Sequence, residues 1–393
     1  MRKEEEFFLQ VLADYLNKRT TAVPEHLNWH VLEELGQNHR LSGIIYHQCK
    51  NSIGRSDLPA EVKTKWKKRY MFNFFLYSKR LALLNQIDTE FQKESIPYLI
   101  FKGTEVARFY PVPAQRTMGD SDLLVHEEDK QRAGETLARM GFEVETGRPI
   151  EWRASKDEMI IELHHRLLYN KSVELQSLQD WGDMAWDYVT AQENSVRRRL
   201  DLTYHLVYVL LHLRKHFLHT GVGFRQFMDV AVLALQPEID WQQARLWIKE
   251  LNLEKFSQVC FAFCKRWFSV EIPTAETELQ EDFYNDAAEK LFDGGVFGRG
   301  DKEYKENFIF NEVHYAKSSG TFSILKRVFL PYHVLRGVSY CKFLDGRPYL
   351  LPVAWCWRSI YLIGTGSFIP HVKGAYSKAT IRKKEDWLAR WGL

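Results

Sequence analysis

The chain has 393 residues, with 54 Lys and Arg against 51 Asp and Glu, and 45% of the residues are apolar. This composition excludes collagen-like, disordered and disulfide-scaffold proteins. The net charge of +3 gives no support for a general polyanion or membrane-surface binder. The length allows two to three domains, each large enough to bury a core of its own.

The five cysteines include no CxxC pair and are odd in number, which is typical of a reducing cytosol and predicts a cytoplasmic protein. Cys260 and Cys264 lie one helical turn apart in an apolar run, so we expect small core residues rather than zinc ligands. No run reaches the roughly 18 apolar residues of a membrane span. The nearest, Leu350–Ile363, is interrupted by Arg358 and predicts a buried helix, with a membrane-surface helix as the alternative.

In chain order, apolar residues at helical spacing first predict helices over residues 5–18, within 27–50 and over 60–94. The aromatic stretch from Phe72 to Tyr77 falls on the third helix and is expected in the core. Short apolar runs then predict strands over 97–101, 121–125, 142–146 and 159–165, with a helix over 127–140 that Gly141 ends. From about residue 172 nearly all of the pattern is helical.

The predicted architecture is therefore α+β, with a small mixed sheet embedded in a mostly helical chain. We expect an N-terminal helical segment over 1–94 and an α/β core over 95–170. A helical domain over 171–300 and a C-terminal helical segment over 301–393 would follow. Because strands dominate only in the second segment, its strand ends and loops are the place to look for chemistry.

Two carboxylates open the second predicted strand. Asp120 and Asp122 are two residues apart, so the alternation of a strand puts both on one face. Adjacent carboxylates raise each other's pKa unless a cation lies between them, and such an oxygen pair suits Mg²⁺. Glu162 joins them if its strand pairs beside theirs, which would make a two-metal site. The alternative is that these acids are ordinary surface residues.

Cations surround this acidic sequence. Lys102 and Gly103 precede Thr104 at the start of a short helix, where backbone amides can approach an anion. Arg116 lies four residues before Asp120 and is within reach of a phosphate. The order of residues differs from a P-loop. The alternative is that Lys102 and Arg116 neutralise the acids.

Histidines line one face of a helix over 202–219. His212 and His216 are one turn apart and could bind a metal, but no acid is interleaved. A polar seam against the α/β core is the favoured interpretation. An intermediate one has His212, His216 and Arg225 lining a nucleotide or acceptor pocket, with Asp229 orienting Arg225 at i, i+4.

Taken together, these motifs resemble the uncharacterised nucleotidyltransferase family of the polymerase-β-like superfamily. The resemblance rests on Lys102-Gly103, Arg116, the strand Asp120–Val125 and a later Glu162-Leu163-His164. It extends downstream to the block around His212, His216 and Arg225 and to residues 294–298 and 348–352, and spans about residues 30–365.

The resemblance implies transfer of a nucleoside monophosphate from an NTP, most simply ATP, with two Mg²⁺ ions. Asp120, Asp122 and Glu162 would hold the metals, and Glu162 would assist deprotonation of the acceptor hydroxyl. Lys102, Gly103, Thr104, Arg116, His164, His212, His216 and Arg225 would bind the nucleotide. We expect a small molecule, sugar or peptide as acceptor, because the near-neutral charge argues against nucleic acid.

Two other functions stay open. One is a non-catalytic nucleotide- or partner-binding protein on the same fold, and the other is an RNA-modifying transferase. The C-terminal segment 301–393 has a net charge of +8 against −5 for residues 1–300. It is therefore the part of the chain where we expect contact with an anionic partner.

Overall fold

The computed structural model describes residues 1–52, 57–146, 151–168, 176–193, 195–219, 221–273, 277–295, 332–335, 339–344, 346–364 and 378–393. Contacts divide the chain into two compact units. The first comprises residues 1–217 and 221–299 with Gly392, and the second comprises residues 218–220, 300–391 and 393. The finer division into four segments stays a prediction.

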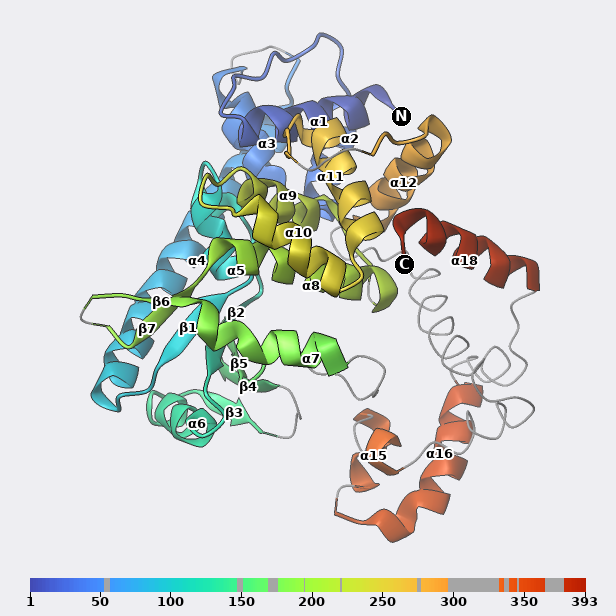
Figure 1. The fold of residues 1–393 in the computed structure, drawn as a ribbon. Coiled ribbons are helices and arrows are strands. Elements are labelled where there is room, and N and C mark those ends of the chain that lie inside the picture. Colours follow the sequence, from blue (N-terminus) through green and yellow to red (C-terminus); the bar gives the residue numbers. More distant parts are fainter. Residues whose placement is uncertain are drawn as a thin grey trace. The chain divides into compact units, whose positions relative to one another are not determined.

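A mixed sheet of seven strands forms the centre of the first unit (Figure 1). In spatial order its strands are β3 (Glu143–Glu145), β4 (Glu151–Lys156), β5 (Met159–His164), β2 (Asp120–Val125), β1 (Tyr98–Phe101), β7 (Arg197–Leu200) and β6 (Val189–Ala191). The pairs β2–β5 and β1–β7 are parallel, and the other neighbours are antiparallel. A mixed sheet among many helices confirms the predicted α+β class.

Four strands predicted from the sequence are present, and three others were missed. β6 and β7 correct the expectation that the chain is helical from residue 172 onward. β7 reads Arg-Arg-Arg-Leu and carries no apolar alternation, so its sequence gives no strand signal. It is a strand because its backbone pairs with buried β1, where Tyr98 lies opposite Arg197.

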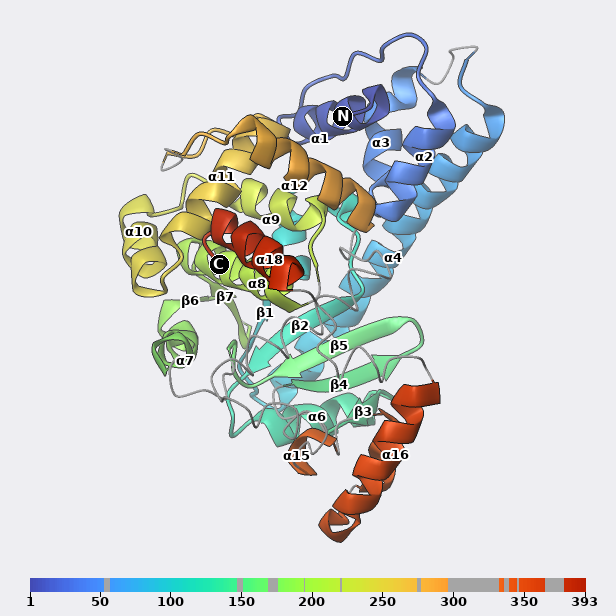
Figure 2. The ribbon, with the colours of Figure 1, turned by 90° about the vertical axis from the view of Figure 1, so that its right-hand side faces the viewer.

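One face of the sheet carries a hydrophobic core. The helices α4 (Ala60–Lys93) and α6 (Lys130–Arg139) pack on this face (Figure 2). Leu123 and Val125 of β2 and Ile161 and Leu163 of β5 are almost fully buried in this cluster. Because side chains alternate along a strand, the neighbouring residues of β2 and β5 must point to the opposite face.

The 34-residue helix α4 buries only a narrow seam. Its buried positions are Val62, Trp66, Asn73, Arg80, Leu84, Ile87 and Phe91, which follow each other at intervals of three, four and seven residues. The expectation that the aromatic stretch is core was wrong, because Phe72, Phe74 and Phe75 are 44%, 37% and 58% exposed. They lie outside the seam, and long helices commonly touch the core along one side only.

Helices from both ends of the first unit complete it. The N-terminal group is α1 (Lys3–Leu16), α2 (Trp29–Asn38) and α3 (Ser42–Cys49). The helix α7 (Gln176–Asp183) lies between β5 and β6 in the chain. After the last strand come α8 (Leu202–His219), α9 (Phe224–Ala234), α10 (Trp241–Glu250), α11 (Glu254–Phe268) and α12 (Glu281–Gly294). Cys260 and Cys264 are buried in α11, which confirms their expected place in the core.

The second unit is described in part, as α15 (Tyr332–Leu335), α16 (Leu351–Gly364) and α18 (Lys378–Trp391). The expected buried helix near residue 350 is α16, but Val353, Trp357 and Ile360 are 55%, 47% and 61% exposed, so that expectation was wrong. Ala354 and Arg358 lie on its buried side. Across the described residues, no helix is both long and apolar enough to span a bilayer.

Candidate active site

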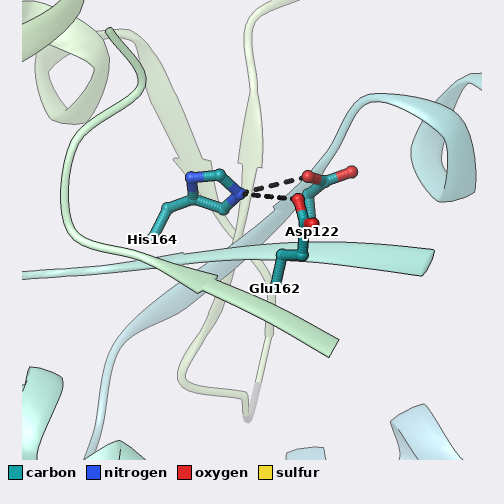
Figure 3. A group of neighbouring side chains, drawn as sticks. All are labelled: Asp122, Glu162 and His164. Atoms are coloured by element: carbon teal, nitrogen blue, oxygen red, sulfur yellow. Dashed lines mark hydrogen bonds and ion pairs between the residues drawn. The ribbon is translucent and has the colours of Figure 1, made fainter. Parts of the chain in front are cut away.

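The pairing of β2 with β5 brings the predicted acids together. In this parallel pair Asp122 lies opposite Glu162, and Asp120 lies opposite Ile160. Partners in register point to the same face, so both carboxylates leave the sheet on the side away from the α4–α6 core. The geometry that the sequence required of Glu162 is therefore present (Figure 3).

His164 completes a compact group with these two acids. Its Nε2 lies 3.1 Å from Asp122 Oδ1 and 3.6 Å from Glu162 Oε2. Figure 3 shows the imidazole pointing between the two carboxylates. Within the part of the chain that the structure describes, this is the group in which three potential metal-ligand atoms lie within 4.8 Å of one another.

Asp120 lies one pleat before Asp122 on the same face of β2 and is partly exposed. Burial and the negative charges of Asp122 and Glu162 raise the pKa of Asp120, and Lys102 opposes the rise. The negative charges of Asp122 and Glu162 therefore both act on Asp120, although Asp120 is outside the compact group of three. Three carboxylates in one electrostatic field favour a bound cation.

Lys102 is the cation that meets these acids. Its Nζ lies 2.5 Å from Asp122 Oδ1. Burial is the largest single influence on the pKa of Lys102 and would lower it, but the charge and hydrogen bond of Asp122, together with Tyr208 and Glu162, raise the pKa overall. Although burial would raise the pKa of Asp122, Lys102 and His164 hold it well below the usual range. Lys102 and Asp122 are therefore a charged pair at neutral pH.

The backbone of Lys102 is strained. Its φ of 53° and ψ of −135° lie in a region that favours glycine. The amide of Lys102 donates to His205 Nε2 at 3.1 Å, so α8 holds the backbone while Asp122 holds the side chain. Such strain persists only where the surroundings impose it, and it is common at functional sites.

The next two residues begin the short helix α5 (Gly103–Val106). The Thr104 hydroxyl donates to Ser121 Oγ at 3.0 Å, which ties α5 to β2 between the two aspartates. A Cβ on Gly103 would lie 2.2 Å from Arg116 Nη1, so only glycine fits here without movement. The predicted Lys-Gly-Thr element is therefore next to the acids, and Gly103 makes room for Arg116.

Arg116 is anchored by Asp229 of α9. Its Nε and Nη2 donate to the two Asp229 oxygens at 3.1 and 2.6 Å, and both side chains are buried. Tyr110 donates to the same carboxylate at 2.7 Å. The expectation that Asp229 orients Arg225 is corrected by this geometry, since Arg225 Nη1 donates to the Thr117 carbonyl at 2.7 Å.

Arg80 is a residue of the site that sequence reasoning missed. It is 4% exposed, and its Nη1 donates to Ser121 Oγ at 2.7 Å. Arg80 and Arg116 both line a cavity of about 40 Å³ beside this strand. A signal was present, because Arg80 follows Asn73 by seven residues and precedes Ile87 by seven, on the buried seam of α4.

The histidine helix α8 lies on the same face of the sheet as the acids. Burial and the charge of Lys102 hold the pKa of His212 well below its usual value, and His212 Nε2 lies 2.9 Å from His216 Nε2. Lys215, on the same turn, reaches solvent but is buried in part, and this partial burial and the charge of Lys102 lower its pKa. The charge of Asp122 acts on both His212 and Lys215. That His212, His216 and Arg225 line a nucleotide or acceptor pocket stays a prediction.

Comparison with known proteins agrees with this geometry. A model of a family described as uncharacterised nucleotidyltransferases matches residues 25–269. The match includes every predicted site residue. It ends before residues 294–298 and 348–352, which the sequence resemblance had also included. Residues 296–298 lie outside the described residues. No curated protein and no solved structure matches the chain. Because the family model covers more than half of the sequence, the chain belongs to the uncharacterised nucleotidyltransferase family.

Proposed function

We propose that this protein is a Mg²⁺-dependent nucleotidyltransferase that moves a nucleoside monophosphate from an NTP to an acceptor hydroxyl. The observation that carries the proposal is the register of β2 and β5, which sets Asp122 beside Glu162 with Asp120 on the same face. Membership of a nucleotidyltransferase family supports the reaction class. A site with carboxylates at its centre suits a metal ion, and the cations around it suit the phosphates of a nucleotide.

The donor set suits a divalent metal. Asp120, Asp122 and Glu162 offer carboxylate oxygens, which are the ligands that Mg²⁺ prefers. The raised pKa of Asp120 comes in part from the other two acids, a repulsion that a cation would relieve. Two Mg²⁺ ions bound here would stabilise the charges of the attacking and leaving oxygens. His164 fits as a residue that orients Asp122.

In the proposed reaction the acceptor oxygen attacks the α-phosphorus. A new phosphorus–oxygen bond forms, the bond to the β-phosphate oxygen breaks, and pyrophosphate leaves. Glu162 is partly exposed and is suited to accept the acceptor's proton. Lys102 and Lys215 are suited to stabilise the negative charge of the phosphates.

The remaining predicted residues support the nucleotide pocket. Thr104 ties α5 to β2, Gly103 leaves room for the Arg116 guanidinium, and Asp229 of α9 anchors Arg116. His212, His216 and Arg225 are proposed to line the pocket from α8 and α9. ATP is the proposed nucleotide, with a small molecule, sugar or peptide as acceptor. The free cysteines favour a cytoplasmic location. The positive charge of the C-terminal segment favours contact with an anionic partner.

The test is label transfer from each of the four NTPs, labelled at the α-phosphate, in the presence of Mg²⁺ and a cell extract. We expect Asp122→Asn to reduce transfer at least about 100-fold, because it removes a metal ligand and the partner of Lys102. Asp157→Asn is the matched control, since Asp157 is exposed and lies in the turn after β4. It should retain wild-type transfer.

Two outcomes would contradict the proposal. One is no transfer by the wild-type protein with any of the four NTPs, and the other is equal transfer by wild type and Asp122→Asn. Calorimetry with a non-hydrolysable NTP distinguishes the remaining possibility. Tight nucleotide binding without transfer would favour the non-catalytic binding protein.

A further inference from the structure

The exposed side of α4 carries a dense positive charge that the site at the sheet does not use. Between Glu61 and Asp88 the helix has no Asp or Glu and, besides the buried Arg80, six Lys and Arg. Five of these cations fall between Lys63 and Arg69, and all five are exposed. The small net charge of the chain therefore hides a strongly basic helix.

Aromatic rings alternate with cations along one stripe of this helix. Lys68, Phe72, Phe75 and Lys79 occupy positions i, i+4, i+7 and i+11, which share a helical face. The rings of Phe72 and Phe75 are stacked, with centroids 6.3 Å apart and an interplanar angle of 27°. Both rings are about half exposed. A folded protein exposes such rings together most often where they contact a partner.

The basic end of this stripe borders a groove between α2 and α4. The groove has a volume of about 440 Å³ and is lined by three cations, one ring and three other side chains: Lys65, Lys68, Arg69, Phe72, Glu33, Gln37 and Ser42. Glu33 is 5% exposed, and its Oε2 has no hydrogen-bond partner. Buried carboxylate oxygens normally accept a hydrogen bond, so a ligand with an N–H or O–H group could donate one to Glu33 here.

We propose that this face of α4, comprising the groove and the stripe from Lys68 to Lys79, binds single-stranded nucleic acid. Lys65, Lys68 and Arg69 are placed to contact phosphates, and Phe72 and Phe75 to stack with bases. Glu33 would accept hydrogen bonds from a base edge. Cations that follow a groove beside exposed rings are the usual means of binding such strands.

An anionic membrane surface fits these observations less well. Helices that lie on membranes separate a continuous apolar face from a charged one. On α4 the cations and the rings share one stripe instead, and the groove beside them is also lined by the polar side chains Glu33, Gln37 and Ser42. A flat bilayer cannot reach into such a groove, whereas a single strand can.

The test is fluorescence anisotropy of a labelled 12-nucleotide oligouridylate with the full chain, without nucleotide or metal. We expect binding that weakens roughly 20- to 50-fold between 50 and 200 mM salt, as three or four phosphate contacts predict. Lys65→Glu/Lys68→Glu should weaken binding at least about tenfold and flatten the salt dependence. Phe72→Ala/Phe75→Ala should weaken binding about tenfold or more with the salt dependence unchanged, because stacking is not ionic.

Arg245→Glu/Lys249→Glu is the matched control, since both residues are exposed on α10 and the charge change is the same. It should bind the oligonucleotide as the wild type does. The proposal is overturned if the wild type does not bind, or if the control weakens binding as much as the α4 variant. It is also overturned if the chain binds anionic vesicles through Phe72 and Phe75 and not the oligonucleotide. Since the measurement needs no transfer reaction, it is independent of the proposed function.

Discussion

At the scale of single residues, the site depends on a few backbone positions where only one kind of side chain fits. Lys102 keeps a conformation that favours glycine because His205 and Asp122 hold its two ends. Gly103 follows directly and leaves space for the Arg116 guanidinium. The sequence predicted that both residues belong to the site. It gave no sign that Gly103 is needed for Arg116 rather than for a phosphate.

Gly103→Ala is expected to destabilise the protein and to impair nucleotide binding. The new Cβ would lie 2.2 Å from Arg116 Nη1, so the guanidinium or α5 must move. Overpacking of this kind costs about 1–3 kcal/mol of unfolding free energy, which urea denaturation measures. Gly119→Ala is the control, because a Cβ there meets nothing within 4 Å. Equal stability of the two variants would refute the close approach.

At the scale of elements, the site is assembled by contacts between segments far apart in the sequence. α9 supplies Asp229 to Arg116 of the loop before β2, and α4 supplies Arg80 to Ser121 of β2. Periodicity predicted α4 and the strands β1, β2 and β5, because each buries a regular apolar pattern. It could not predict which acid each arginine meets, since those pairs depend on how the elements pack.

Breaking the ion pair between Arg116 and Asp229 should be costly. Asp229→Asn leaves the buried guanidinium without a counter-charge, which is expected to lower the unfolding free energy by about 3–5 kcal/mol. Arg116→Met in the same chain removes the unpaired charge. The double variant should therefore be less destabilised than the sum of the two single variants. An additive result from denaturant unfolding would show that the two side chains are not coupled.

At the scale of the whole molecule, stability should fall between pH 7 and pH 5. His39 is surrounded by the rings of Phe8, Phe224 and Phe292, and burial lowers its pKa to about 4. The unfolded chain takes up a proton near pH 6.5 and the folded chain does not, so acid favours unfolding. This difference removes roughly 2 kcal/mol for His39 between pH 7 and pH 5.

The measurement is the urea midpoint at both pH values for the wild type and for His39→Leu. The variant should lose less stability on acidification, because its site has no proton to exclude. His30→Gln is the control, since His30 is exposed, and it should follow the wild type. If His39→Leu lost as much stability between pH 7 and pH 5 as the wild type, the assignment of this pH dependence to His39 would be contradicted. His205, whose pKa burial also lowers to about 4, should contribute in the same direction.

The sequence by itself determined the fold class and the family, and it predicted the acids of the candidate site. Local patterns carry this information, because the Asp-x-Asp strand, the Glu-Leu-His strand and the Lys-Gly turn each lie within a few residues. Tertiary structure alone decided that Asp122 lies beside Glu162 and that Arg116 belongs to Asp229. It also decided that the rings of α4 face solvent and that Arg-Arg-Arg-Leu is a strand. These outcomes depend on which surfaces meet, and burial between distant segments is not encoded in any short stretch of sequence.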